Sequence, residues 1–354
     1  ELDFFSSLLT LSPRIRELQV GELQLAAEQG ADGHWRIPGL DTSAGGESGI
    51  DPLIDAVLAV RRGEITKLRL DLRYASGTES SLRADEFSLT GDGHFRRGFA
   101  QLNAGGEGGI SILVEAYGDP RDSQFTAEAY VAAEDSRFSS LSPLLGDSAP
   151  LIDSPVEGEL WFTWREGWRL SLLGELRSKQ LAVGALWGSD EVLDDVAMRF
   201  TGSHRDGFWR ISMAELDANW RGERVDLSGL SVRHPEPTRW RFLLPQLDLV
   251  SSSSLLRDTG YLAEKWQSVV DALAPGGLVR NIAVELQQGE QGIADYQLRA
   301  ELANVDVSPW RGAPGAKGLN GFLEVGKNRG MVIIDTRCRS IHYCFVPYSH
   351  LVGI

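Results

Sequence analysis

The chain has 354 residues, of which 42% are hydrophobic and 39 are glycines, a composition typical of a folded β-rich protein and not of a disordered one. Its formal charge of −15 excludes a basic footprint for nucleic acid and argues against broad electrostatic adsorption to anionic lipid headgroups. No uninterrupted run of 18 apolar residues occurs, so the sequence predicts no membrane-spanning helix, and no signal peptide opens it.

One short phrase occurs four times: an acidic residue and Gly, then an aromatic residue within two positions, then alternating residues. The phrase begins at Asp32, Asp92, Glu166 and Asp206. Asp-Gly and Glu-Gly suit hairpin turns because Gly tolerates positive φ, and an aromatic residue fits the pleated strand that follows. Flanked by runs of period-two hydrophobicity, these turns predict a mainly β fold: a long, twisted, curled antiparallel meander with a few short helices.

In chain order, the first strands are predicted at 18–26 and 34–38. Asp51-Pro52 then opens a helix, because Asp caps a helix and Pro suits its first turn, and Gly63 ends it. Residues 65–74 alternate strongly and predict a strand. The following segments predict four more strands and a short helix: 81–90, 94–103, 109–117, 123–132 and, as helix, about 138–145.

The alternation resumes at Val156 and continues to residue 244. Residues 251–273 carry an apolar stripe at helical spacing and predict a helix, kinked at Gly260. Further strands are predicted after it, at 279–287, 294–302, 319–325 and 331–335. By the alternation criterion the chain holds about sixteen strands and three helices.

A longer repeat links two distant segments, each of which follows a predicted helix. The same spacing occurs in two sets of residues: Gly63, Ile65, Leu68, Leu70 and Leu72, and Gly277, Val279, Ile282, Val284 and Leu286. The repeat predicts at least two units of helix plus meander that stack into a solenoid-like body. We expect sub-units at 1–137, 138–250 and 251–335.

The end of the chain differs in pattern from the body. Residues 336–354 contain no acidic residue and no period-two alternation, and they hold both cysteines. We interpret this segment as a non-native or frameshifted tail. A metal site could be drawn from Cys338, His342, Cys344 and His350, but their spacing matches no zinc pattern.

An alternating meander has one apolar face, which must be hidden by a second sheet, by closure into a barrel, or by an apolar ligand. Three helices are too few to cover the predicted sheet, so we expect an open groove that accepts acyl chains. Burying each CH₂ is worth about 0.8 kcal/mol, so a long acyl chain gains on the order of 10 kcal/mol before entropy losses. The candidate lining residues are Leu68, Leu70, Leu72, Ile112, Val114, Leu160, Phe162, Leu170, Leu172, Val284 and Leu286.

No motif in the sequence predicts catalysis, a metal or a cofactor. No spacing selects a pair of carboxylates, and the Ser251–Ser254 run lacks a Gly-x-Ser-x-Gly elbow, so it is interpreted as a loop and cap. Histidines at 34, 94, 204 and 234 lie at or beside predicted turns and are interpreted as solvated. Trp161, Trp164 and Trp168 suggest a sugar platform, but Trp161 should face away from Trp164, which favours sheet packing.

Several segments resemble known families. Residues 18–25, 32–40 and 51–58 resemble the AsmA-like superfamily, in which a strand, an aromatic turn and a short helix precede the main sheet. Residues 304–321, with the pattern W-x-G-x-P-G-x-x-G-L-x-G, are similar to the YhdP branch. The resemblance covers residues 1 to about 335.

The resemblance implies a repeating β-groove protein of the Gram-negative envelope, anchored in the inner membrane by an N-terminal helix that this chain lacks, with its body in the periplasm. It implies carriage of phospholipid toward the outer membrane, support of the permeability barrier, and no catalytic residues. Two alternatives stay open. One is a structural or interaction scaffold whose apolar face is covered by protein; the other is a carbohydrate-binding or hydrolytic domain with paired carboxylates beside exposed Trp.

Overall fold

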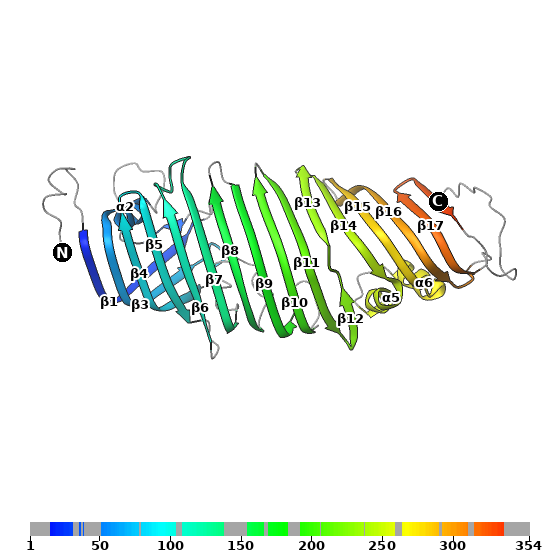
Figure 1. Ribbon diagram of the computed structural model, residues 1–354, viewed down its shortest axis with the longest axis horizontal. Coiled ribbons are helices and arrows are strands. Elements are labelled where there is room, and N and C mark those ends of the chain that lie inside the picture. The colour runs from blue at the N-terminus through cyan, green and yellow to red at the C-terminus, as the bar shows by residue number, and fades with distance from the viewer. Residues whose placement is uncertain are drawn as a thin grey trace. The chain divides into compact units, whose positions relative to one another are not determined.

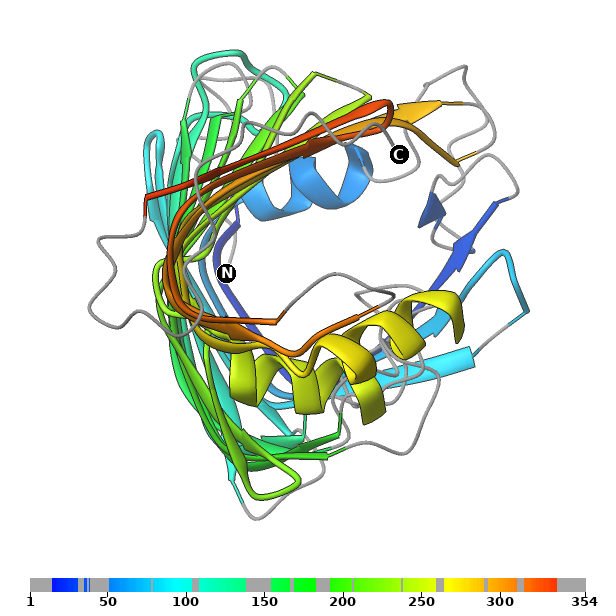
Figure 2. The same ribbon diagram turned by 90° about the vertical axis from the view of Figure 1, so that its right-hand side faces the viewer.

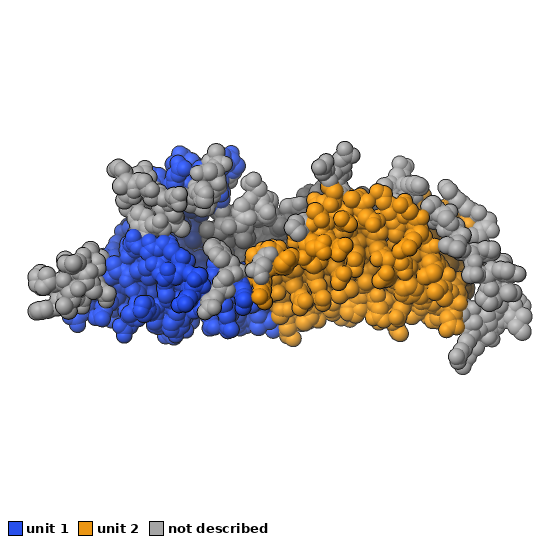
Figure 3. Space-filling view, turned by 90° about the horizontal axis from the view of Figure 1, so that it is seen from above, with its two compact units in different colours: residues 1–192 blue, residues 193–354 orange. Residues whose placement is uncertain are grey.

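The chain divides into two compact units, residues 1–192 (unit 1) and 193–354 (unit 2), as Figure 3 shows. The computed structural model describes residues 15–30, 35–36, 38, 51–77, 79–103, 108–137, 154–165, 169–182, 192–205, 207–236, 238–258, 264–289, 292–310 and 315–335. The helix expected at 138–145, the turns at Asp32 and Glu166, and the tail 336–354 lie outside these residues.

The described part of unit 1 is a sheet with one helix, labelled in Figure 1. Its elements are β1 (Ile15–Gln29), β2 (Trp35–Arg36), α2 (Asp51–Ala59), β3 (Val60–Arg73), β4 (Glu79–Asp92), β5 (Phe95–Asn103), β6 (Gly109–Tyr117), β7 (Thr126–Arg137), β8 (Pro155–Arg165) and β9 (Arg169–Ala182). From β3 to β9 each strand pairs antiparallel with the next, so the predicted meander is confirmed. The hairpin at Asp92 turns through Gly93, whose φ is 55°.

The first strand departs from the predicted antiparallel pattern. β1 pairs parallel with β3, from Ile15 opposite Val60 to Glu28 opposite Arg73. Parallel neighbours need a crossover connection, and the chain between them supplies one with β2 and α2. The expectation of a wholly antiparallel sheet is therefore wrong at this edge.

The first helix is shorter than predicted. It begins at Asp51 as expected but ends at Ala59, and Gly63 lies inside β3. Gly63 pairs with Leu18 on one side and Leu89 on the other. The backbone groups of residues 60–63 are thus satisfied by the sheet ladder, which ends the helix before its expected glycine stop.

Unit 2 is a second meander with a pair of helices. Its elements are β10 (Val192–Arg205), β11 (Phe208–Trp220), β12 (Glu223–Asp226), β13 (Ser231–Glu236), β14 (Arg239–Asp248), α5 (Leu249–Asp258), α6 (Glu264–Leu273), β15 (Gly276–Gly289), β16 (Gly292–Val307), β17 (Ala316–Gly326) and β18 (Arg329–Ile334). β11 pairs with both β12 and β13, and antiparallel pairing then continues from β13 to β18.

The helix predicted at 251–273 is two helices, α5 and α6, on either side of Gly260. α5 begins two residues earlier than predicted because Asp248 caps it. The Asp248 carboxylate accepts hydrogen bonds from the backbone N–H of Val250 at 2.9 Å and of Ser251 at 3.0 Å. β15 follows α6 as β3 follows α2, which agrees with the internal repeat seen in the sequence.

Four strands contain a bulge built on an Asp or Asn in the left-handed region. These residues are Asp135 (φ 42°), Asp195 (φ 51°), Asn281 (φ 49°) and Asn304 (φ 54°), and each lies at a break in register. Asp and Asn tolerate this conformation better than other residues with a Cβ. A bulge adds one residue and bends its strand, and Figure 2 shows strands of both units bent.

Each bulge also keeps the apolar side chains on one side. The residues that flank it on that side are three positions apart instead of two: Ala133 and Ser136, Leu193 and Val196, Val279 and Ile282, Leu302 and Val305. Without the extra residue, the second half of each strand would turn its apolar residues to the opposite face.

The exposed bulge residue Asn281 tests this role of backbone conformation. Asn281→Val should lower the free energy of unfolding by about 1–2 kcal/mol, because a β-branched residue is strained at positive φ. Asn281→Gly should cost little, since Gly adopts this φ freely. Urea unfolding of both variants beside the wild type measures the difference. An equal loss in both would mean that the Asn side chain, and not the conformation, stabilises the strand.

Candidate functional site

In unit 1, the register places nine of the predicted lining residues on one face of the sheet. Residues directly opposite each other on antiparallel strands project to the same side. Two rows across β6 to β9 illustrate this. The first is Ile112, Val131, Leu160 and Gly174, and the second is Val114, Ala129, Phe162 and Leu172. Leu170 joins the same face opposite Trp164.

A further row connects this face to β3. It runs from Leu68 through Ala84, Leu102 and Ile110 to Ala133. This row is the most tightly packed part of the face, and Ile110 is fully buried. Leu70 and Leu72 lie beside it on β3 and contact Ala27 of β1 and Tyr74. The nine predicted residues therefore belong to one continuous apolar surface, which we call the apolar face of unit 1.

Most of this face keeps accessible surface. Leu72 is buried, at 5% exposed, whereas the other eight predicted residues are half-buried. Strands β3 to β9 form a single hydrogen-bonded layer. A side chain in a closed core is normally buried on every side. A side chain that packs only against its neighbours in the same sheet stays half-buried, as these eight residues do.

The apolar face of unit 1 is the concave one. Arg96 lies on it, opposite Ala116, and its guanidinium donates a hydrogen bond to the carbonyl oxygen of Leu58 in α2. Arg121 holds the same helix through Asp55, with 2.8 Å between Nη2 and Oδ1. Figure 2 shows α2 on the inner side of the curved strands. The helix therefore covers one end of the apolar face and fixes which side is inward.

Unit 2 has an apolar face of its own, which contains the last two predicted residues. Val284 lies in a row from Phe242 to Leu298 and Val325. Leu286 lies in the next row, between Trp240 and Tyr296. Both predicted residues are half-buried.

A row of aromatic rings and histidines borders this second face. His204 and Trp209 have ring centroids 4.2 Å apart, and His234 and Trp240 have centroids 4.3 Å apart. Trp209 lies directly opposite His234, which joins the two pairs into one row over β10, β11, β13 and β14. Such rings combine an apolar body with a polar nitrogen, which suits a boundary between apolar and aqueous regions.

The interpretation of all four histidines as solvated turn residues is wrong for His204 and His234. Both are half-buried strand residues in ring contact with tryptophan, and the Nδ1 atom of His234 is buried with no hydrogen-bond partner. His94 is exposed beside its turn, as expected, and His34 lies outside the described residues. The period-two alternation around residues 204 and 232–234 indicates that both histidines lie in strands. Their closeness to turns led instead to the interpretation as turn residues.

The other candidate chemistries do not assemble in the described part of the chain. Trp161 and Trp164 project to opposite faces, as predicted, so they form no common sugar platform. Ser252 and Ser253 lie in α5 and donate to the backbone carbonyls of Asp248 and Val250. Within the described ranges, no three His, Cys, Asp or Glu side chains gather as a metal site, and no helix is long and apolar enough to cross a membrane.

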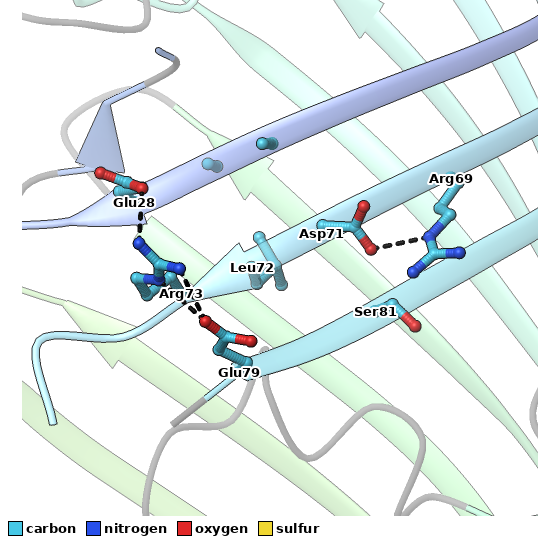
Figure 4. Close-up of a pocket in the computed structure, with 9 residues that line it drawn as sticks. Glu28, Arg69, Asp71, Leu72, Arg73, Glu79 and Ser81 are labelled. Carbon is cyan, nitrogen blue, oxygen red and sulfur yellow. Dashed lines mark hydrogen bonds and ion pairs between the residues drawn. The ribbon is translucent and has the colours of Figure 1, made fainter. Parts of the chain in front are cut away.

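A hollow of about 450 Å³ beside β1, β3 and β4 is lined mostly by charged side chains, together with Ala26, Ala27 and Leu72. Figure 4 shows Arg73 between Glu28 and Glu79, with Arg69 on Asp71. The distances are 3.2 Å from Arg73 to Glu28 and 2.8 Å from Arg73 to Glu79. The hydrogen bond from Arg69 lowers the pKa of Asp71 and keeps it charged. These charges pair with one another, so the hollow suits neither an acyl chain nor an uncompensated ion.

One comparison with known proteins finds a family match. A family model described as YhdP protein matches residues 1–347. The chain belongs to the YhdP family. No curated protein and no solved structure matches it. This match confirms the resemblance to the YhdP branch that was drawn from residues 304–321. The family is an envelope family of transport or structural proteins.

Two truncations test how far the apolar face of unit 1 is open. Ile110→Ala should lower the free energy of unfolding by about 2–5 kcal/mol, because it leaves a cavity at a fully buried site. Leu172→Ala should cost about 1 kcal/mol, since a half-buried leucine has less apolar area to lose. Chemical denaturation measures both. Equal losses would mean that Leu172 is covered in solution.

Proposed function

We propose that this chain is a non-enzymatic segment of a periplasmic lipid-transfer bridge that carries phospholipid between the inner and outer membranes and supports the outer-membrane permeability barrier. The observation that carries the proposal is the half-buried apolar face on a single-layer sheet. The eleven predicted lining residues are proposed to contact acyl chains. An inner-membrane anchor outside these residues would hold the protein in the envelope.

The energetics of this face suit transfer. An acyl chain of roughly sixteen carbons gains on the order of 10 kcal/mol from burial before entropy losses, which is enough to favour leaving water. Contacts with apolar side chains have no fixed direction, so one methylene position is worth about as much as the next. A lipid can therefore shift along such a surface without breaking directed bonds. No catalytic step, metal or cofactor is needed for this role.

The aromatic row of unit 2 gives this proposal a polar boundary. His204 and His234 bring ring nitrogens to the border of an otherwise apolar face, beside Trp209 and Trp240. Amphipathic rings are favoured where hydrocarbon meets a hydrated headgroup. We assign this row to the headgroup side of the bound lipid.

Adjacent leucines on β9 provide a matched test. Leu172 lies on the apolar face and Leu173 on the opposite face, where it is 43% exposed. Leu172→Asp should reduce co-purified phospholipid several-fold, because a charge on the apolar face is costly to cover with an acyl chain. Leu173→Asp should leave it unchanged. Native mass spectrometry and lipid extraction of the purified proteins measure both.

Circular dichroism and thermal unfolding of the same samples show that each variant is folded. If the folded wild type carries no phospholipid when purified from cells, or if both aspartate variants lose it equally, the transfer proposal fails. A scaffold whose apolar face is covered by protein would then be the better description.

A further inference from the structure

The face of unit 1 opposite the apolar face carries an unexpected apolar row. Directly opposed positions on β5 to β9 hold Phe99, Leu113, Tyr130, Trp161 and Leu173. We call these five residues the transverse row, because they cross the strands one residue per strand. The row lies on the convex side, away from the face proposed to bind acyl chains.

Part of the transverse row is open to solvent. Trp161 is 37% exposed and Leu173 is 43% exposed, and the other three residues are half-buried. The rings of Tyr130 and Trp161 contact each other with centroids 5.4 Å apart. Single exposed apolar residues are normal, but five in one register row form a contiguous patch of the kind that marks an interaction site.

Over β7 to β9, the rows on either side of this patch are acidic. Glu159 lies directly opposite Glu175 in one flanking row, and Glu115 lies directly opposite Glu128 in the other. Glu115 forms an ion pair with Arg97 within the sheet. Over β7 to β9 the two flanking rows contain no Lys or Arg: their residues are Ala132, Glu159, Glu175, Glu128, Thr163 and Ser171.

Directly opposed like charges destabilise a sheet. A cation of a partner placed beside Glu159 and Glu175 would reduce this repulsion. Tyr130 brings its hydroxyl to Glu159, and burial together with this hydrogen bond raises the pKa of Tyr130. Through this hydrogen bond, the apolar row contacts its acidic border, and the two form one surface.

The dimensions of the row fit a helix. Five strands span four spacings of about 4.8 Å, or roughly 19 Å. A helix of about 13 residues has the same length, and its apolar ridge repeats every 5.4 Å, close to the strand spacing. We propose that the transverse row is a docking surface for an amphipathic helix of a protein partner, with Leu-like residues on its ridge and Lys or Arg on both sides.

The probe is a fluorescent helical peptide of about 14 residues with leucines at helical spacing and lysines elsewhere. Its counterpart has the same leucines with glutamates in place of the lysines. Fluorescence anisotropy with the full chain should show that the Leu/Lys peptide binds at least tenfold more tightly than the Leu/Glu peptide. Trp161→Ser and Leu173→Ser should each weaken binding at least fivefold.

Leu172→Asp is the matched control on the opposite face and should leave peptide binding unchanged. Glu159→Lys combined with Glu175→Lys should reverse the preference between the two peptides. Because this double change alters charge at one exposed position, Glu159, and one half-buried position, Glu175, its fold is checked by circular dichroism. The serine variants test the row independently of it.

Several outcomes would overturn the proposal. They are equal binding of the two peptides, loss of binding in Leu172→Asp but not in the serine variants, and absence of binding to the folded wild type. Concentration-dependent self-association that Trp161→Ser removes would assign the row to a second copy instead. Since lipid content is measured separately on the opposite face, failure here leaves the lipid proposal intact, and failure there leaves this one intact.

Discussion

A single-layer β-sheet with one apolar face cannot satisfy that face by itself, and this constraint governs the rest of the structure. In unit 1 the most buried positions, such as Ile110 and Leu102, are shielded by neighbours within the same layer. Further along the face, Phe162 and Leu172 keep part of their surface. Apolar surface left in water costs about 25 cal/mol per Å², so the open part of the face favours any apolar molecule that covers it.

The bulges make such a face continuous and curved. A strand of 14 residues without a bulge would twist steadily, whereas an added residue bends it at one point. Asp135 in unit 1 and Asn281 in unit 2 place this bend where the chain can adopt positive φ at low cost. Ile282 after the bulge then stays on the same side as Val279 before it. The curvature and the one-sided apolar pattern therefore have the same local cause.

The two faces of unit 1 use different physical interactions. On the convex side, pairs such as Arg97 with Glu115 are cross-strand contacts between partly exposed groups, which contribute little to stability but keep the surface soluble. On the concave side, the rows described above hold no charged residue, and Arg96 beside them holds α2. The proposed lipid and the proposed helical partner would therefore lie on opposite sides of the sheet and would not compete.

The local pattern of the sequence predicted a large share of this protein. Asp92-Gly93 predicted its hairpin because a turn is decided by a few neighbouring residues, and period-two alternation assigned all eleven candidate lining residues to strands, with the nine in unit 1 on one face. The sequence did not predict contacts between segments that are distant along the chain. Nothing near residue 60 indicates that β1 pairs parallel with β3 and so ends α2 at Ala59, because that ladder joins residues about 45 positions apart. The rings beside His204 and His234, and the alignment of Phe99 with Leu173 across five strands, likewise depend on register between strands. Alternation states which side of its own strand a residue occupies, and only the assembled sheet decides which residues of other strands lie beside it.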